Sequence, residues 1–164
     1  MRDNKLRTLW AQGKPAINGW LAVPNGFSAE VMGHQGWDTL TIDMQHGLID
    51  EGALLTMLQA LQSTPAMPVV RAPWLDPAPL MKILDAGAQA LICPMVNTRE
   101  DAQRLVSYTH YAPRGGRSFG PVRGTRTLGP EAAKKAAEAG TLDLATKSGC
   151  MACHGMKSKI VGPG

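Results

Sequence analysis

The stretch WDTLTIDMQHGLIDEGALLTMLQALQSTPAMPVVRA, residues 37–72, contains two β-rich segments on either side of a helical one. Residues 37–43 alternate in polarity, and residues 67–72 carry adjacent valines, so both segments are typical of strands. Between them, large apolar residues recur at helical spacing: Leu54, Met57, Leu58 and Leu61. This order predicts two parallel strands joined by a right-handed helical crossover.

The same alternation continues toward the N-terminus. Residues 17–23 are typical of a strand, and residues 27–36 of a short helix with Phe27 and Val31 on one face. A strand followed by a helix is therefore already present before residue 37.

The alternation also continues toward the C-terminus. Residues 76–87 should form a helix, with Asp76 as N-cap, proline at the first helical position and Gly87 at its end. Residues 88–96 are typical of a fourth strand.

A last helix is expected over residues 98–110. It opens with Thr98 and Asp101 at the spacing of a capping box, and its packing residues would be Ala102, Leu105 and Val106. Four strand–helix units in sequence are therefore predicted.

These four units fit either a doubly wound sheet or a (β/α)8 barrel. Polar residues follow the predicted strands: His46 after the second, Arg71 at the end of the third and Asn97 after the fourth. In a barrel these positions share the C-terminal rim, where active sites lie. No Gly-x-Gly-x-x-Gly follows the first strand, which disfavours the dinucleotide-binding sheet. We therefore expect an α/β chain that forms part of a (β/α)8 (TIM) barrel.

Three segments closely resemble the HpcH/HpaI aldolase (citrate lyase-like) family: residues 18–50, 68–102 and 111–124, the last reading YAPRGGRSFGPVRG. The resemblance covers residues 5–124 with the spacings intact. It implies a (β/α)8-barrel lyase that uses a divalent metal, Mg²⁺ or Mn²⁺. Such enzymes make and break carbon–carbon bonds next to pyruvate-like 2-oxo acids, so a small 2-oxo or hydroxy acid is the expected substrate.

The resemblance also implies three site residues. His46, in IDMQHG, matches the general base, and Asp85, in ILDAG, matches the acid that pairs with it, within the chain or in a neighbouring subunit. Arg71, in PVVRAPW, matches the residue that holds the 2-oxo acid. The residue types suit these roles, because imidazole titrates near neutral pH and guanidinium grips a carboxylate with two hydrogen bonds. The alternatives are a structural His46 and an Asp85 that merely faces solvent.

The chain departs from the family after its fourth unit. A full barrel takes roughly 250 residues. The family's metal ligands, a Glu and an Asp from later strands, have no counterpart here, so no metal-binding residue is assigned. We therefore expect weak activity or none from this chain alone. Half a barrel also leaves open strand edges, which favours a homo-oligomer.

The composition changes near residues 124–130. Residues 1–126 contain nine Arg and three Lys, whereas residues 127–164 contain five Lys and no Arg. All Trp, Tyr and Phe lie before residue 120. We therefore expect a barrel segment over 1–126, a linker over 127–140 and a separate segment over 141–164.

The last segment contains Cys-x-x-Cys-His, the attachment signature of c-type haem. Residues 141–164 resemble the N-terminal part of a class I cytochrome c, a short helical haem-attachment segment. The resemblance implies that Cys150 and Cys153 bind haem covalently and that His154 is an axial ligand. A chance match or a zinc-binding pair are the alternatives.

Charge and hydropathy indicate which partners and which compartment to expect. The net charge is +4 without a run of Lys or Arg, so no nucleic acid is expected, and no apolar run is long enough for a membrane span. The start lacks the apolar core of a secretory signal, which favours the cytoplasm, although the haem motif alone would suggest the periplasm. Three functions remain open: an aldolase, a c-type haem electron carrier, or an inactive chimeric remnant.

Overall fold

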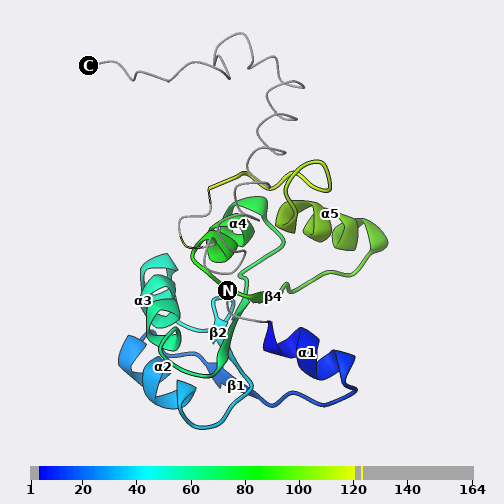
Figure 1. Cartoon of the computed structure of the whole chain (residues 1–164). Helices are drawn as coiled ribbons and strands as arrows, with labels where there is room; N and C mark the ends of the chain where they lie inside the picture. The colour runs from blue at the N-terminus through cyan, green and yellow to red at the C-terminus, as the bar shows by residue number, and fades with distance from the viewer. Residues whose placement is uncertain (1–3, 121–122, 124–164) are drawn as a thin grey trace, which may run out of the picture.

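A computed structural model describes residues 4–120 and 123 and contains one four-stranded sheet (Figure 1). All strands are parallel and lie in sequence order, as predicted. The strands are β1 (Asn18–Leu21), β2 (Thr39–Asp43), β3 (Met67–Arg71) and β4 (Ala90–Ile92). Parallel neighbours in sequence order are the arrangement that a barrel of βα units requires.

Helices connect the strands. They are α2 (Gly26–Gly33), α3 (Glu51–Leu61), α4 (Pro77–Asp85) and α5 (Arg99–Thr109). Figure 1 shows α2 and α3 side by side along the sheet. The predicted starts hold: the Asp76 side chain accepts a hydrogen bond from the backbone of Ala78, and Thr98 with Asp101 forms a complete capping box.

A further helix, α1 (Lys5–Ala11), precedes β1 and was not predicted. It buries none of its residues, and its seven residues are too short a window for helical periodicity to reveal it in the sequence. Lys5 pairs with Asp38 at 2.8 Å, and the Asn4 side chain donates to the Gln89 carbonyl at 3.2 Å. Since these partners precede β2 and β4, α1 lies across the amino ends of the strands.

The two faces of the sheet differ in chemistry. Leu40, Ile42 and Val70 join the predicted α3 stripe in one buried cluster. The alternate residues of β2 point to the opposite face. There the Thr39 and Thr41 hydroxyls donate to the Asn18 side-chain oxygen at 2.7 and 3.0 Å. The helices therefore pack on the apolar face of the sheet, and the polar side chains lie on the opposite face.

Helix α2 faces the core with small residues, and not with the two large ones that share a face. Phe27 and Val31 are 75% and 45% exposed, whereas Ala29 and Gly33 are buried. A Cβ on Gly33 would lie 2.5 Å from the Thr64 methyl carbon. Close approach to the end of α3 therefore selects the small face.

Two further expectations need correction. On α5, Ala102 and Val106 are exposed, and Leu105 alone of the predicted trio packs against the core. Strand β4 is shorter than the predicted 88–96. It ends before Pro94, which lacks a backbone donor, and Met95, which has φ 57°.

The predicted linker over 127–140 and the haem-attachment residues Cys150, Cys153 and His154 lie outside the described residues. The division into segments therefore stays a prediction. None of the helices in the described part of the chain is long and apolar enough to cross a membrane.

Candidate active site at the carboxyl ends of the strands

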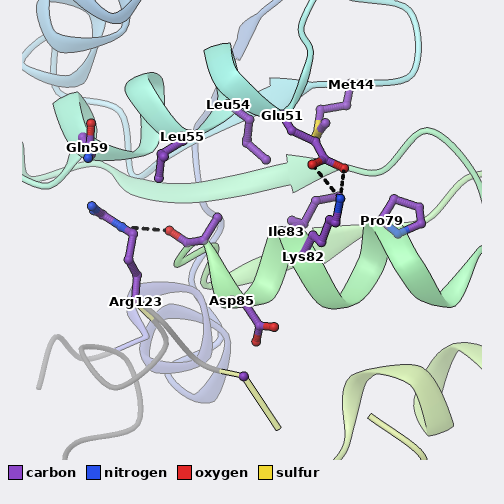
Figure 2. A pocket seen from close by; sticks show the side chains of 12 residues that line it. Met44, Glu51, Leu54, Leu55, Gln59, Pro79, Lys82, Ile83, Asp85 and Arg123 are labelled. Carbon is purple, nitrogen blue, oxygen red and sulfur yellow. Dashed lines mark hydrogen bonds and ion pairs between the residues drawn. The ribbon is translucent and has the colours of Figure 1, made fainter. Parts of the chain in front are cut away.

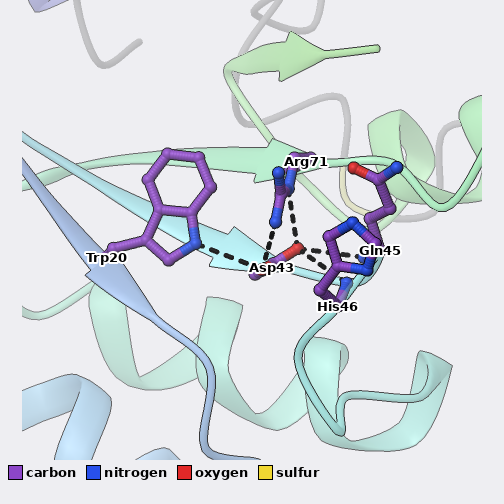
Figure 3. A network of polar contacts seen from close by, with 5 residues as sticks. All are labelled: Trp20, Asp43, Gln45, His46 and Arg71. Atoms are coloured by element: carbon purple, nitrogen blue, oxygen red, sulfur yellow. Dashed lines mark hydrogen bonds and ion pairs between the residues drawn. The ribbon is translucent and has the colours of Figure 1, made fainter. Parts of the chain in front are cut away.

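An ion pair joins the ends of β2 and β3. The strand register places Asp43 directly beside Arg71. Arg71 Nε donates to Asp43 Oδ1 at 2.8 Å, and Arg71 Nη2 donates to Oδ2 at 2.6 Å (Figure 3). This two-pronged contact fixes the distance between the two groups and the edge of the guanidinium that faces the carboxylate.

Trp20, on β1, completes the cluster from the next strand. Its indole N–H donates to Asp43 Oδ2 at 3.2 Å, and the Arg71 guanidinium carbon lies 4.9 Å from the indole centroid. Three successive strands therefore each contribute one side chain to the same cluster.

The loop after β2 closes over the same carboxylate. The backbone N–H groups of Gln45 and His46 donate to Asp43 Oδ1 at 3.0 and 3.2 Å. Gly47 permits the tight turn, since a Cβ there would lie 2.3 Å from the Asp43 carbonyl oxygen. The His46 backbone is thus anchored beside Arg71, while His46 itself is exposed.

The surroundings of Asp43 keep it ionised. The Arg71 guanidinium holds the pKa of the Asp43 carboxyl well below its ordinary value, and the Trp20 and backbone donors act in the same direction against the effect of burial. Asp43 in turn raises the pKa of Arg71. Since Asp43 is only 3% exposed and its carboxylate accepts five hydrogen bonds, it is a structural anion and not a proton acceptor at neutral pH.

Arg71 keeps one edge for another anion. A guanidinium has five N–H donors, and Asp43 engages Nε and one hydrogen of Nη2. Within the described residues, Nη1 and the second hydrogen of Nη2 form no further hydrogen bond, and the side chain is 22% exposed. This outer edge matches the geometry of a carboxylate.

Asp85 lies elsewhere. It ends α4, which returns from the carboxyl end of β3 toward the start of β4, so it lies near the opposite end of the sheet. Its Oδ1 accepts from Arg117 Nη2 at 2.5 Å, and the Arg117 guanidinium stacks on Tyr111 at 4.6 Å. The cluster that brings Arg71 and the His46 backbone together therefore does not include Asp85.

A groove of about 590 Å³ runs between α3 and α4 (Figure 2). Its lining is largely aliphatic, and its Glu51 and Lys82 side chains pair with each other at 2.9 Å. Figure 2 shows the Asp85 carboxylate on the side of α4 that points away from α3. Because its charges are largely paired, we place the candidate site at the strand ends and not in this groove.

The described residues do not fit a metal ion. Within residues 4–120 and 123, no three His, Cys, Asp or Glu side chains lie close enough together to bind one. Asp43, the acid nearest the candidate site, is already saturated with donors.

Sequence reasoning missed Asp43 and Trp20. The available signal for Asp43 was its place as the last residue of a strand that runs into the His46 loop. Trp20 offered no local signal, because its partners lie 23 and 51 residues away and only the strand order brings them together.

The fold and the cluster define a class: parallel βα units with an arginine whose outer edge is open at the carboxyl ends of the strands, the end at which barrel enzymes carry their active sites. The sequence pattern of the HpcH/HpaI aldolase/citrate lyase family matches residues 17–153. The chain belongs to this family. The match extends past residue 126 and includes Cys150 and Cys153.

Curated relatives agree with this family. A hydroxypyruvate/pyruvate aldolase of Rhizorhabdus wittichii is 51% identical over 120 residues, which are 73% of this chain and 48% of the relative. A 4-hydroxy-2-oxo-heptane-1,7-dioate aldolase of Salmonella dublin is 40% identical over 117 residues, 71% of this chain and 44% of the relative. The chain thus spans about half the length of the curated relatives it matches.

Solved structures agree as well. An HpcH/HpaI aldolase/citrate lyase family protein from Burkholderia cenocepacia superposes with a TM-score of 0.72 at 30% identity, over 84% of this chain and 57% of that one. Macrophomate synthase superposes with a TM-score of 0.68 at 27% identity, over 82% and 48%. The barrel-type fold predicted for the N-terminal part is thereby confirmed.

Proposed function

We propose that this chain carries the acid-binding and proton-accepting part of a metal-dependent 2-oxo acid aldolase, a carbon–carbon lyase. The observation that carries the proposal is the Arg71 guanidinium, which Asp43 fixes at the carboxyl ends of the strands with one edge left open. The names of the relatives support a small 2-oxo or hydroxy acid as substrate.

In this proposal Arg71 holds the substrate carboxylate through its outer edge. His46 takes the proton of the hydroxyl on the carbon that becomes the aldehyde. The bond between that carbon (C4) and C3, the carbon next to the 2-oxo group, then breaks. Its electron pair moves toward the 2-oxo group and leaves a pyruvate-type enolate. Asp43 does not compete for this proton, because Arg71 keeps its pKa low.

The metal that the family resemblance implies, Mg²⁺ or Mn²⁺, would stabilise the negative charge of the enolate. Because the described residues provide no ligand set for it, we propose that the chain alone is weakly active or inactive.

Asp85 could serve a second copy of the chain. Its partner Arg117 is nearly buried, while the Asp85 side chain remains 21% exposed. We therefore propose a homo-oligomer in which this acid meets a histidine of a neighbouring copy. Sedimentation velocity would test this, and a monomer at all concentrations would contradict it.

The experiment for the proposed function is release of pyruvate from a 4-hydroxy-2-oxo acid with Mg²⁺ or Mn²⁺, using the full chain and its His46→Ala variant. Slow release that His46→Ala abolishes would support the proposed role of His46. Efficient turnover would contradict the proposed incompleteness. Release that is the same in both chains would exclude His46 as the base.

The motif Cys150-x-x-Cys153-His154 supports a second candidate, a c-type haem protein for electron transfer. The proposal rests on the sequence alone, because these residues lie outside the described ones. Export behind a leader into a compartment with haem-attachment enzymes, followed by haem staining of a denaturing gel, would test it. A stained band that Cys150→Ser removes would support haem attachment, and an unstained band would exclude it.

A further inference from the structure

Trp20 contacts both members of the ion pair at the strand ends. Its indole N–H binds Asp43 Oδ2, the same oxygen that receives Arg71 Nη2. Its ring faces the Arg71 guanidinium at 4.9 Å (Figure 3). One side chain thus restrains the carboxylate through a hydrogen bond and the guanidinium through a cation–π contact.

Trp20 is not simply a core residue. It is 45% exposed, whereas the neighbouring Leu21 on the other face of β1 is buried. An indole placed for packing would bury its ring, but this ring lies on the polar face of the sheet. Its position is therefore explained by its polar partners and not by burial.

The restraint acts on the plane of the guanidinium. Arg71 is a long side chain at the end of β3, and Asp43 alone leaves it free to tilt about the axis of their two hydrogen bonds. The guanidinium carbon lies over the indole ring, 4.9 Å from its centroid, and this contact limits the tilt. An anion then has to approach Arg71 in its plane, at Nη1 and the second hydrogen of Nη2.

We infer that Trp20 is a positioning residue, which aligns Arg71 so that its outer edge receives the carboxylate of a 2-oxo acid end-on. The inference rests on the proposed function, because it assumes that Arg71 binds the carboxylate. Trp20 acts through Arg71 and Asp43, so it sets the affinity for the acid without taking part in proton transfer.

The test uses the full chain and oxalate, a small planar dicarboxylate, as the probe. Oxalate is titrated into the wild type, Trp20→Phe, Trp74→Phe and Arg71→Lys, and the dissociation constant is measured by calorimetry. Trp74→Phe is the matched control. Trp74 comes shortly after the carboxyl end of β3, is 55% exposed and is not part of the Asp43 cluster. The ¹⁵N–¹H signals of the Trp20 indole and of Arg71 Nε are followed in the wild type.

We expect Trp20→Phe to weaken oxalate binding roughly tenfold, since a hydrogen bond to a charged group is lost, and Trp74→Phe to change it less than about twofold. In the wild type, the Trp20 indole and Arg71 Nε signals should shift together with one dissociation constant. This second readout needs no variant and does not depend on how well Trp20→Phe folds.

Two results would overturn the inference, and they are distinguishable. If Arg71→Lys weakens binding but Trp20→Phe does not, and the indole signal does not move, Arg71 binds the acid without help from Trp20. If the wild type does not bind oxalate, the proposed function of Arg71 fails, and the inference fails with it.

Discussion

Two aspartate–arginine pairs in this molecule have the same chemistry and opposite exposure. At the strand ends, the Asp43 side chain is 4% exposed and that of Arg71 is 22% exposed. At the end of α4, the Asp85 side chain is 21% exposed and that of Arg117 is 9% exposed. Each arginine also stacks on an aromatic ring, Trp20 or Tyr111.

The difference decides what each pair can bind. The strand-end pair buries its anion and presents a guanidinium, so it suits an anionic partner such as a carboxylate. The pair at the end of α4 buries its cation and presents a carboxylate, so it suits a cationic or hydrogen-donating partner. The exposed member of each ion pair therefore indicates the charge of the partner that the pair suits.

The largest effect should follow from Asp85→Ala. This change leaves the nearly buried Arg117 without its counter-ion, and a guanidinium cannot lose its charge by deprotonation. We expect the free energy of unfolding to fall by about 3 kcal/mol, equally at pH 5 and pH 8. Urea denaturation measures this, and the double variant Asp85→Ala/Arg117→Met should recover much of the loss. A cost below about 1 kcal/mol would show that the pair is effectively solvated.

The strand-end pair should instead give a pH-dependent effect. Because the folded-state pKa of Asp43 is depressed, its stabilisation is present above its unfolded value of about 3.9 and is lost as the pH falls further. In Arg71→Met the main cause of the depression is gone, so stability should fall less steeply below about pH 4 than in the wild type. The measurement is the urea midpoint of both chains from pH 6 to pH 2. If the midpoint falls equally steeply with pH in the wild type and in Arg71→Met, Asp43 is not coupled to Arg71.

A turn that contains a glycine lies beside each pair. Replacing either glycine with alanine should lower the free energy of unfolding by about 1–3 kcal/mol. A Cβ on Gly47 would lie 2.3 Å from the Asp43 carbonyl oxygen, and a Cβ on Gly115 would lie 2.4 Å from the His110 carbonyl oxygen. Gly47→Ala should also weaken acid binding, because it displaces the His46 loop, whereas Gly115→Ala should leave binding unchanged. Thermal unfolding and oxalate titration of both variants separate these outcomes.

The smallest effect should come from Lys82→Ala. The Glu51–Lys82 pair bridges α3 and α4, but the Lys82 and Glu51 side chains are 64% and 58% exposed. A solvated pair of this kind stabilises by about 0–1 kcal/mol. A larger loss in urea denaturation would mean that the α3–α4 groove is held together mainly by this bridge.

The sequence was sufficient to predict the features that local sequence patterns determine. The order of strands and helices, the α3 stripe, the Asp76 cap and the Thr98–Asp101 capping box were all correct. Each of these features depends on residues within a few positions of one another. Their physical causes, side-chain periodicity and end-capping, are visible without any tertiary contact.

The sequence did not reveal what depends on packing between elements. Helix α1 has no buried residue, and α2 turns small residues inward because of its close approach to α3. The Trp20–Asp43–Arg71 cluster requires three strands in register. Their positions at the strand ends placed His46 and Arg71 on one rim, and the family resemblance gave them roles. The carboxylate that organises them became evident only from the sheet.

The central claim is that the open edge of Arg71 binds the carboxylate of a 2-oxo acid. The most direct measurement is calorimetric titration of pyruvate into the wild type, Arg71→Lys and Arg117→Lys. Lysine keeps the charge but loses the planar fork, so Arg71→Lys should bind pyruvate at least about tenfold more weakly, while Arg117→Lys should match the wild type. Equal affinity in the wild type and Arg71→Lys, or a loss confined to Arg117→Lys, would contradict the account.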